Sequence, residues 1–277
     1  NPKIIILAYV PTKSFNDYYW TDELHQHLLK GIQDSWWLTE ASGTTLSVWP
    51  QTRTLNAASP WQSYLPGYVH DEIMSTGLWD GVFYDEFSTT ISWLNNGNID
   101  MQRDGVRDDP RLADVAWKRG MINMLKKTRE LIGSEAVIVV NGDSDPDVQP
   151  FVNGRMFESF PTPWEGRGTW TDSMRSYLRI QSQVGYPPVN IINANTGGSG
   201  NREDYRKMRF SLTSTLMGDG YFGFDFGETD HGQLWRYDEQ EVSLGRPLGG
   251  PVNVLDPKIK DMRSGVWRRD FERGVVI

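Results

Sequence analysis

The chain has 277 residues, of which 38% are hydrophobic and 23% charged; it has no cysteine, and its net charge is −8. This composition is typical of a folded globular protein, and the absence of cysteine excludes disulfides, thiol catalysis and thiolate metal sites. Scattered Lys and Arg on an acidic chain argue against nucleic acid as a partner, and no apolar run approaches the roughly 20 residues that cross a membrane.

Six segments read as buried β-strands, and helical patterns separate most of them. In chain order, the predicted strands span 3–10, 79–87, 136–142, 155–160, 189–197 and 220–227. The predicted helices span 61–77, 108–133, 171–184 and 202–217, and Gly77 and Gly133 are expected to end the first two. A shorter strand is expected at 45–50, in a hairpin with residues 36–38.

This alternation favours the α/β class, with a parallel sheet covered by helices. We favour a (β/α)8 TIM-type barrel over a doubly wound sheet, because no Gly-rich phosphate-binding turn follows any predicted strand. A complete barrel needs eight strands, so the first two are expected to be missing from this chain or divergent. The start at Asn1 agrees with a piece of a longer, multidomain protein. We expect the barrel over 1–240, and over 241–277 a segment that closes it and begins a C-terminal β region.

Polar residues occupy the C-terminal ends of nearly all the predicted strands. They are Asp85 and Glu86, Asn141 and Asp143, Glu158, Asn193 and Asn195, and Asp225 and Glu228. In a (β/α)8 barrel the catalytic residues gather at this end, so these side chains are candidates for one polar site. The alternative is that they cap helices or fix loops, and this applies most to Asn141 and Asn195.

The position of each carboxylate on the predicted strand at 79–87 indicates which way its side chain points. Successive side chains on a strand point to opposite faces, so only one of Asp85 and Glu86 can face a barrel axis. The other is expected to meet a helix or the edge of a neighbouring strand. Asp80 lies at the start of the strand, where it is expected to cap or pair.

Five stretches carry a pattern that spans nearly the whole chain. They are WLTEASGTTLSVWPQTRTLNAAS, LWDGVFYDEFS, NIDMQRDGVRDDPRLADVAWKRGM, RMFESF and VWRRDFERGVVI. In this order they resemble a group of bacterial glycoside hydrolases, the glycosyl-hydrolase-like family fifteen. More distantly, the chain is similar to endo-α-1,4-polygalactosaminidases and to α-galactosidase-type barrels. The resemblance implies a carboxylate pair formed by Asp85 and Glu158, on strands four and six of a complete barrel.

Glycoside hydrolysis commonly uses two carboxyl groups, one as acid and one as nucleophile or base. Together with the resemblance, this predicts a retaining, α-linkage-specific hydrolase of a polysaccharide or oligosaccharide, with Asp85 as nucleophile and Glu158 as acid/base. An extracellular or cell-surface location is inferred from this function. Candidate substrate-binding residues are Glu86, Asn141, Asn195 and Asp225 for sugar hydroxyls, Trp36, Trp37, Trp49, Trp164 and Trp235 as stacking platforms, and Arg53.

The stretch NIDMQRDGVRDD resembles a calcium-binding loop in part. Counted from its first Asp, it supplies ligand positions one, three, five, seven and nine, and a Gly at six. These candidate metal ligands are Asp100, Gln102, Asp104, the Val106 carbonyl and Asp108. Arg111 stands where the bidentate Glu should be, so the alternative is an acidic turn that caps the next helix. Apart from this structural calcium, no cofactor is expected.

The four histidines, His25, His27, His70 and His231, are not spaced like a metal site and are expected at the surface. Two other functions stay open. A barrel that binds glycans without cleaving them would need no carboxylate pair. A metal-dependent lyase would need three convergent acids and a Lys or His base, and no Lys lies at a predicted strand end.

Overall fold

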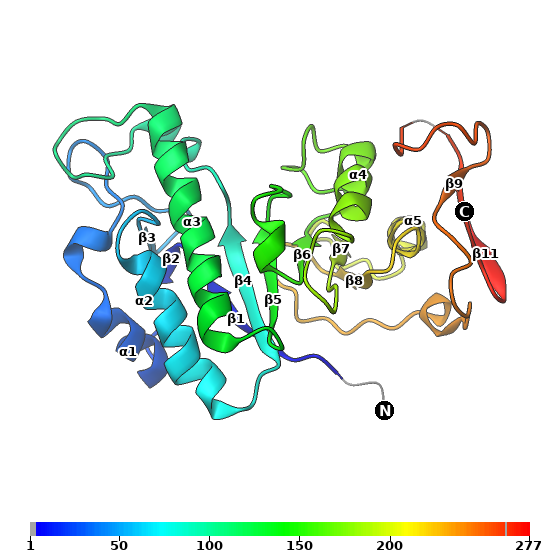
Figure 1. The fold of residues 1–277 in the computed structure, drawn as a ribbon, viewed down its shortest axis with the longest axis horizontal. Coiled ribbons are helices and arrows are strands. Elements are labelled where there is room, and N and C mark those ends of the chain that lie inside the picture. The colour runs from blue at the N-terminus through cyan, green and yellow to red at the C-terminus, as the bar shows by residue number, and fades with distance from the viewer. Residues whose placement is uncertain (1–3, 264) are drawn as a thin grey trace. The chain divides into compact units, whose positions relative to one another are not determined.

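The computed structural model describes residues 4–263 and 265–277 of the chain. It divides into two compact units, Asn1–Val152 and Asn153–Ile277. Both units have α/β architecture (Figure 1). No helix within the described ranges is long and apolar enough to cross a membrane.

The first unit is built on three parallel strands in the order β1-β4-β5. Val82 and Tyr84 are fully buried, and the Tyr84 hydroxyl lies 2.8 Å from Thr128 Oγ1 of helix α3, so this face of β4 packs on that helix. The elements are β1 (Leu7–Pro11), β2 (Ser14–Asn16), α1 (Glu23–Gly31), β3 (Thr52–Thr54), α2 (Trp61–Tyr68), β4 (Gly81–Phe87), α3 (Pro110–Ile132) and β5 (Val137–Gly142). Short helical turns span Asp34–Trp36, Val69–Ile73, Met74–Thr76, Leu94–Gly97 and Gln149–Phe151.

Both predicted helix ends in this unit are confirmed. The helix that begins with α2 continues as a π-turn and a 3-10 turn to Gly77, whose φ of 68° is the left-handed conformation that glycine adopts most easily. Helix α3 begins where the Asp109 carboxylate accepts hydrogen bonds from two backbone N–H groups, and it ends at Gly133 with φ 80°.

The strand predicted at 45–50 is not formed. Thr52 N donates to Trp49 O at 3.1 Å, and this tight turn interrupts the segment at Pro50, which has no N–H for a strand ladder. The short strand β3 follows the turn and pairs with β2. The predicted contact with residues 36–38 survives only as hairpin-like bonding, in which Leu46 N donates to Leu38 O at 2.8 Å.

The second unit repeats the parallel arrangement, with strands in the order β6-β7-β8. Phe157, Ile192 and Phe224, one from each strand, lie in its buried core. Its elements are β6 (Gly154–Phe157), α4 (Trp170–Ile180), β7 (Ile191–Asn195), α5 (Tyr205–Leu216), β8 (Tyr221–Asp225), a helical turn at Asp238–Glu241, β9 (Val252–Asn253), β10 (Trp267–Phe271) and β11 (Gly274–Val276). The last three form an antiparallel sheet within the segment 241–277.

All six main strands predicted from the sequence are therefore present and parallel within their unit. The described residues hold six parallel strands, three in each unit, and not the eight of a complete barrel. The division of the chain at residue 240 stays a prediction.

Candidate active site

The carboxyl ends of β1, β4 and β5 lie at one edge of the first unit, because these strands are parallel. Asp85 is at the centre of that edge. Its Oδ2 accepts a hydrogen bond from the Tyr9 hydroxyl at 2.5 Å, and its Oδ1 accepts from Asn141 Nδ2 at 2.9 Å and from Glu86 N at 2.7 Å. Three donors from three parts of the chain thus hold the Asp85 carboxylate in one orientation.

The orientation of Asp85 follows from strand alternation, as expected. Phe83 lies two residues earlier on the same face, and its ring stacks on Tyr9 of β1 with centroids 6.2 Å apart. The opposite face of β4 carries Tyr84, which is hydrogen-bonded to helix α3. Asp85 therefore faces away from α3.

Glu86 does not follow the simple alternation, because a β-bulge interrupts β4 between Tyr84 and Phe87. Its backbone φ is 57°, a left-handed conformation uncommon for a residue with a long side chain. The carboxylate accepts a hydrogen bond from Ser14 Oγ at 2.6 Å, so it contacts β2, which belongs to the separate two-stranded sheet β2-β3. Burial raises the pKa of Glu86, and the hydrogen bond from Ser14 and the positive charge of Lys13 partly oppose this shift.

Lys13 lies two residues beyond β1 and is 5% exposed. Its Nζ donates to Ser88 Oγ at 3.0 Å and lies 5.3 Å from the centroid of the Trp93 ring. Burial lowers the pKa of Lys13 to about 8, while the carboxylates of Glu86, Asp85 and Asp143 oppose the shift. From the sequence no Lys was expected at a strand end, and Lys13, which lies close to the carboxyl end of β1, was not identified; Thr12, between the strand and Lys13, donates its backbone N–H to Asp85 O at 3.0 Å.

Lys13 should give the protein a measurable dependence of stability on pH. Its pKa is lowered from an ordinary 10.5 to about 8, so between these values the unfolded chain binds more protons than the folded chain. The free energy of unfolding contributed by Lys13 should therefore rise with pH, by on the order of 3 kcal/mol across the window.

The measurement is denaturant unfolding of the wild type and of Lys13→Met from pH 7.5 to 10.5. The difference between the two proteins isolates Lys13, because the other groups that titrate in this range are common to both. If the difference in the free energy of unfolding between the two proteins stays the same from pH 7.5 to 10.5, the lowered pKa of Lys13 is contradicted.

The carboxyl ends of β6, β7 and β8 form the corresponding edge of the second unit. Glu158 directly follows β6, and Asp225 is the last residue of β8. His231 joins them: its Nε2 lies 3.2 Å from Glu158 Oε1, and its Nδ1 lies 2.8 Å from Asp225 Oδ2. Asn193 of β7 donates its Nδ2 to the same Asp225 oxygen at 2.7 Å.

The side chain of His231 is 40% exposed, which agrees with the surface position expected for it, but the ring also bridges two carboxylates, which the sequence did not predict. The other three histidines do lie at the surface, each beside one carboxylate, with side chains 34%, 58% and 46% exposed for His25, His27 and His70. The sequence gives one usable signal for His231, namely its position six residues after the carboxylate that ends β8.

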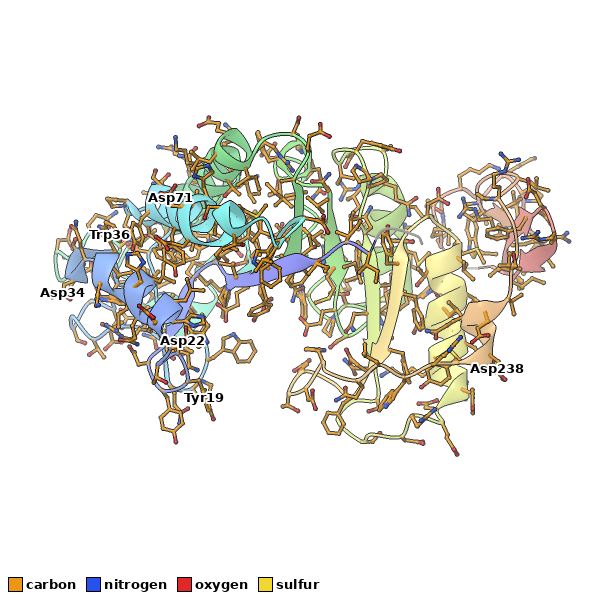
Figure 2. The ribbon with its side chains drawn as sticks, turned by 90° about the horizontal axis from the view of Figure 1, so that it is seen from below. Tyr19, Asp22, Asp34, Trp36, Asp71 and Asp238 are labelled. Atoms are coloured by element: carbon orange, nitrogen blue, oxygen red, sulfur yellow. The ribbon has the colours of Figure 1, made fainter. Side chains whose placement is uncertain are left out.

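Some of the other residues predicted to contact a substrate are buried, and others are exposed. Trp36 and Trp37 are 6% and 5% exposed, so they pack in the core and do not present a ring face to a sugar. Arg53 lies over the Trp37 ring at 3.8 Å and is bound to Asp17 through two hydrogen bonds of 2.6 Å. Figure 2 labels Trp36 and also Tyr19, which is 69% exposed.

Other aromatic rings are available at the surface. Trp49 is 57% exposed, and Trp93, which was not predicted from the sequence, is 54% exposed beside Lys13. In the second unit Trp164 is 46% exposed, whereas Trp235 packs with its ring centroid 6.0 Å from that of Phe224. Asn195 Nδ2 donates to Ser159 Oγ at 2.9 Å, so it fixes the turn after Glu158.

The acidic loop at residues 100–109 is organised by its own backbone. Asp100 is 1% exposed, and its carboxylate accepts hydrogen bonds from Asp104 N at 3.1 Å and Gly105 N at 2.8 Å. Asp108 accepts from Met101 N at 2.8 Å, and burial raises its pKa. Within residues 4–263 and 265–277 no group of three or more His, Asp or Glu side chains is placed to hold a metal ion. Calcium binding by this loop stays a prediction.

Comparisons with known proteins bear on the fold and the family. The sequence model of a family described as hypothetical glycosyl hydrolase family 15 matches residues 1–275. No curated protein sequence matches the chain. The structure of α-L-fucosidase isoenzyme 2 from Paenibacillus thiaminolyticus is 13% identical, with a TM-score of 0.51 over 80% of this chain and 34% of the fucosidase. An α-galactosidase from Geobacillus stearothermophilus is 12% identical, with a TM-score of 0.45 over 84% of this chain and 29% of the galactosidase.

The chain thus spans about a third of the length of the fucosidase. At 13% identity this likeness shows a shared fold.

Proposed function

The chain belongs to hypothetical glycosyl hydrolase family 15, and from that membership we propose that it hydrolyses glycosidic bonds in a polysaccharide or oligosaccharide. The observation that carries the proposal is Asp85, at the carboxyl end of β4. Three hydrogen-bond donors hold its carboxylate on the face directed away from helix α3. The (β/α)8 barrel expected from the sequence is part of this proposal, supported by the shared fold with the fucosidase.

We assign Asp85 as the nucleophile and Glu158 as the acid/base of a retaining mechanism. A nucleophilic carboxylate must be fixed in position and acceptor-only, which agrees with the donors around Asp85. Glu158 directly follows β6, and its carboxyl group lies 3.2 Å from the His231 imidazole, whose other nitrogen lies 2.8 Å from Asp225. Action on an α-linkage, and an extracellular or cell-surface location, belong to the same proposal.

The exposed aromatic rings near Asp85 fit a carbohydrate substrate. Tyr9 and Trp49 are 61% and 57% exposed, and the Tyr9 hydroxyl donates to Asp85 at 2.5 Å. A ring that is exposed on one side and fixed on the other can stack on the apolar face of a sugar with little loss of conformational freedom. We therefore propose Tyr9 and Trp49 as contacts for the substrate, together with Glu86 as an acceptor for a hydroxyl.

The experiment that tests the function is hydrolysis of a panel of aryl α- and β-glycosides and bacterial polysaccharides. Product configuration is read by proton NMR in the first minutes, before the sugar anomerises. Net retention supports the assigned mechanism, and inversion would overturn it. Binding of a glycan that is never cleaved would favour the non-catalytic alternative.

Replacing Glu158 by Gln should separate substrates by their leaving groups. General acid catalysis contributes about 10²- to 10⁴-fold, so the variant should lose that much rate on alkyl glycosides and polysaccharides. A dinitrophenyl glycoside needs no protonation of its leaving group, so its rate of bond cleavage should change little. The exposed Glu203→Gln is the matched control in the same unit. Equal losses on both substrate types would contradict the acid role.

A further inference from the structure

The imidazole ring of His231 stands between two carboxylates that end different strands of the second unit. Nδ1 lies 2.8 Å from Asp225 Oδ2, and Nε2 lies 3.2 Å from Glu158 Oε1. A neutral imidazole has one N–H, and an ionised carboxylate can only accept. With a proton on each nitrogen, the imidazolium form can donate to Asp225 from Nδ1 and at the same time present a positively charged N–H to Glu158 at Nε2.

Asp225 explains why a cation is needed there. Its side chain is 6% exposed, and its Oδ2 accepts hydrogen bonds from both His231 and Asn193. Its Oδ1 is buried and has no hydrogen-bond partner among the described residues. A buried carboxylate is costly unless a positive charge is paired with it, and His231 supplies that charge.

Two further acidic residues, Glu228 and Asp230, precede His231 in the same loop. Glu228 accepts a hydrogen bond from Ser159 Oγ at 3.3 Å, and Ser159 is the residue that follows Glu158 in the chain. Asp230, the residue before His231, accepts from Gly232 N at 2.8 Å. Hydrogen bonds to Asp225 and then to Glu158 raise the pKa of His231 to about 10, so the ring remains charged at neutral pH.

We propose that His231 is a positioning residue for Glu158: Asp225 anchors the ring at Nδ1, and the ring orients the Glu158 carboxyl group through Nε2. The inference rests on the proposed function, in which Glu158 is the acid/base. The contacts run from the end of β8 through His231 to the end of β6, and Asn193 of β7 fixes Asp225 from the side. All three parallel strands of this unit thus contribute to the position of one carboxyl group.

The first test is an NMR titration of the histidine ring protons and nitrogens in the full chain, and it needs no substrate. The signal of His231 is identified by its loss in His231→Gln. In the wild type it should titrate near pH 10, whereas in Asp225→Asn and in Glu158→Gln its titration should move toward 6.5. A wild-type titration near 6.5, or one unchanged in both variants, would overturn the bridge.

The second test is the kinetics of His231→Gln on the best substrate of the panel. We expect kcat to fall about 10- to 100-fold with KM within about 2-fold, because orientation of the reacting group changes and substrate contacts do not. His70→Gln, an exposed histidine beside one carboxylate, is the matched control.

The outcomes separate the two proposals. Unchanged kcat in a folded His231→Gln, on a substrate that the wild type hydrolyses, would overturn the positioning role and leave the hydrolase proposal standing. If the wild type hydrolyses nothing on the panel, the proposed function fails, and with it the role of His231 in the reaction. If His231→Gln does not fold, the same kinetic comparison is made with Asp225→Asn, which removes the anchor of the ring, and wild-type kcat in that variant would overturn the role.

Discussion

Asp85→Asn is expected to lower the rate of glycoside hydrolysis by on the order of 10⁴-fold or more while leaving the fold intact. The amide has the shape of the carboxylate but cannot form the covalent glycosyl bond that a retaining mechanism needs. The Asn oxygen can still accept from Asn141 Nδ2, and the new NH₂ group can donate to the Tyr9 hydroxyl, which also accepts. The measurement is kcat/KM together with a circular dichroism spectrum.

Chemical rescue makes this test specific to the nucleophile. In Asp85→Ala, azide can occupy the vacated space and attack the sugar, so turnover should return with a glycosyl azide of inverted configuration as the product. The matched control is Asp80→Asn at the other end of the same strand, where the carboxylate accepts a hydrogen bond from Ile6 N at 2.8 Å. Wild-type rates in Asp85→Asn, or loss of activity without any azide rescue, would count against the assigned role.

Arg155→Met is expected to destabilise the second unit by about 3–5 kcal/mol, the cost of breaking a buried ion pair from one side. The Arg155 side chain is fully buried on β6, and its Nη1 lies 2.6 Å from Glu165 Oε2. Ser176 Oγ donates to the other Glu165 oxygen, and the guanidinium lies 4.1 Å from the centroid of the Phe157 ring. Removing the cation would leave a buried carboxylate facing an apolar side chain. Denaturant unfolding at neutral pH measures the loss.

A second substitution distinguishes the stranded charge from a simple packing defect. Arg155→Met combined with Glu165→Gln removes both charges, so it should recover part of the lost stability. Arg246→Met breaks an ion pair whose Arg side chain is 88% exposed, and it should change stability very little. If the double variant is less stable than Arg155→Met, the loss arises from packing and hydrogen bonds instead of the unpaired charge.

The main strands could be predicted because the run of apolar side chains in each of them indicates both how long the strand is and that it is buried. In β5 every residue from Val137 to Gly142 is buried. In the sequence, its first four residues are all apolar, and the polar Asn141 follows them. The polar ends of the strands then indicated which residues share an edge. Asp85, Glu158 and Asp225 were among the residues predicted at strand ends, and the structure places them near or directly after the carboxyl ends of β4, β6 and β8.

The missed residues lie where the backbone leaves the regular strand. Lys13 follows the end of β1, and His231 lies in a loop beyond β8, so no periodicity relates either to its neighbours. Trp36 and Trp37 were misjudged for the opposite reason. Their residue type suits sugar binding and burial equally well, and only the packing around them, such as the Trp36–Tyr64 ring contact of 5.4 Å, decides between the two.

The left-handed backbone at Glu86 restricts which residues evolution can place at this position. Gly, Asn and Asp adopt a positive φ at low cost, whereas a longer side chain pays on the order of 1 kcal/mol. For Val, Ile or Thr the conformational free energy of a positive φ is higher still, because their side chains branch at Cβ. Without a role for the side chain, Gly or Asn would be favoured at this position. A Glu kept here by related proteins would therefore indicate selection for a carboxyl group at the end of a long side chain.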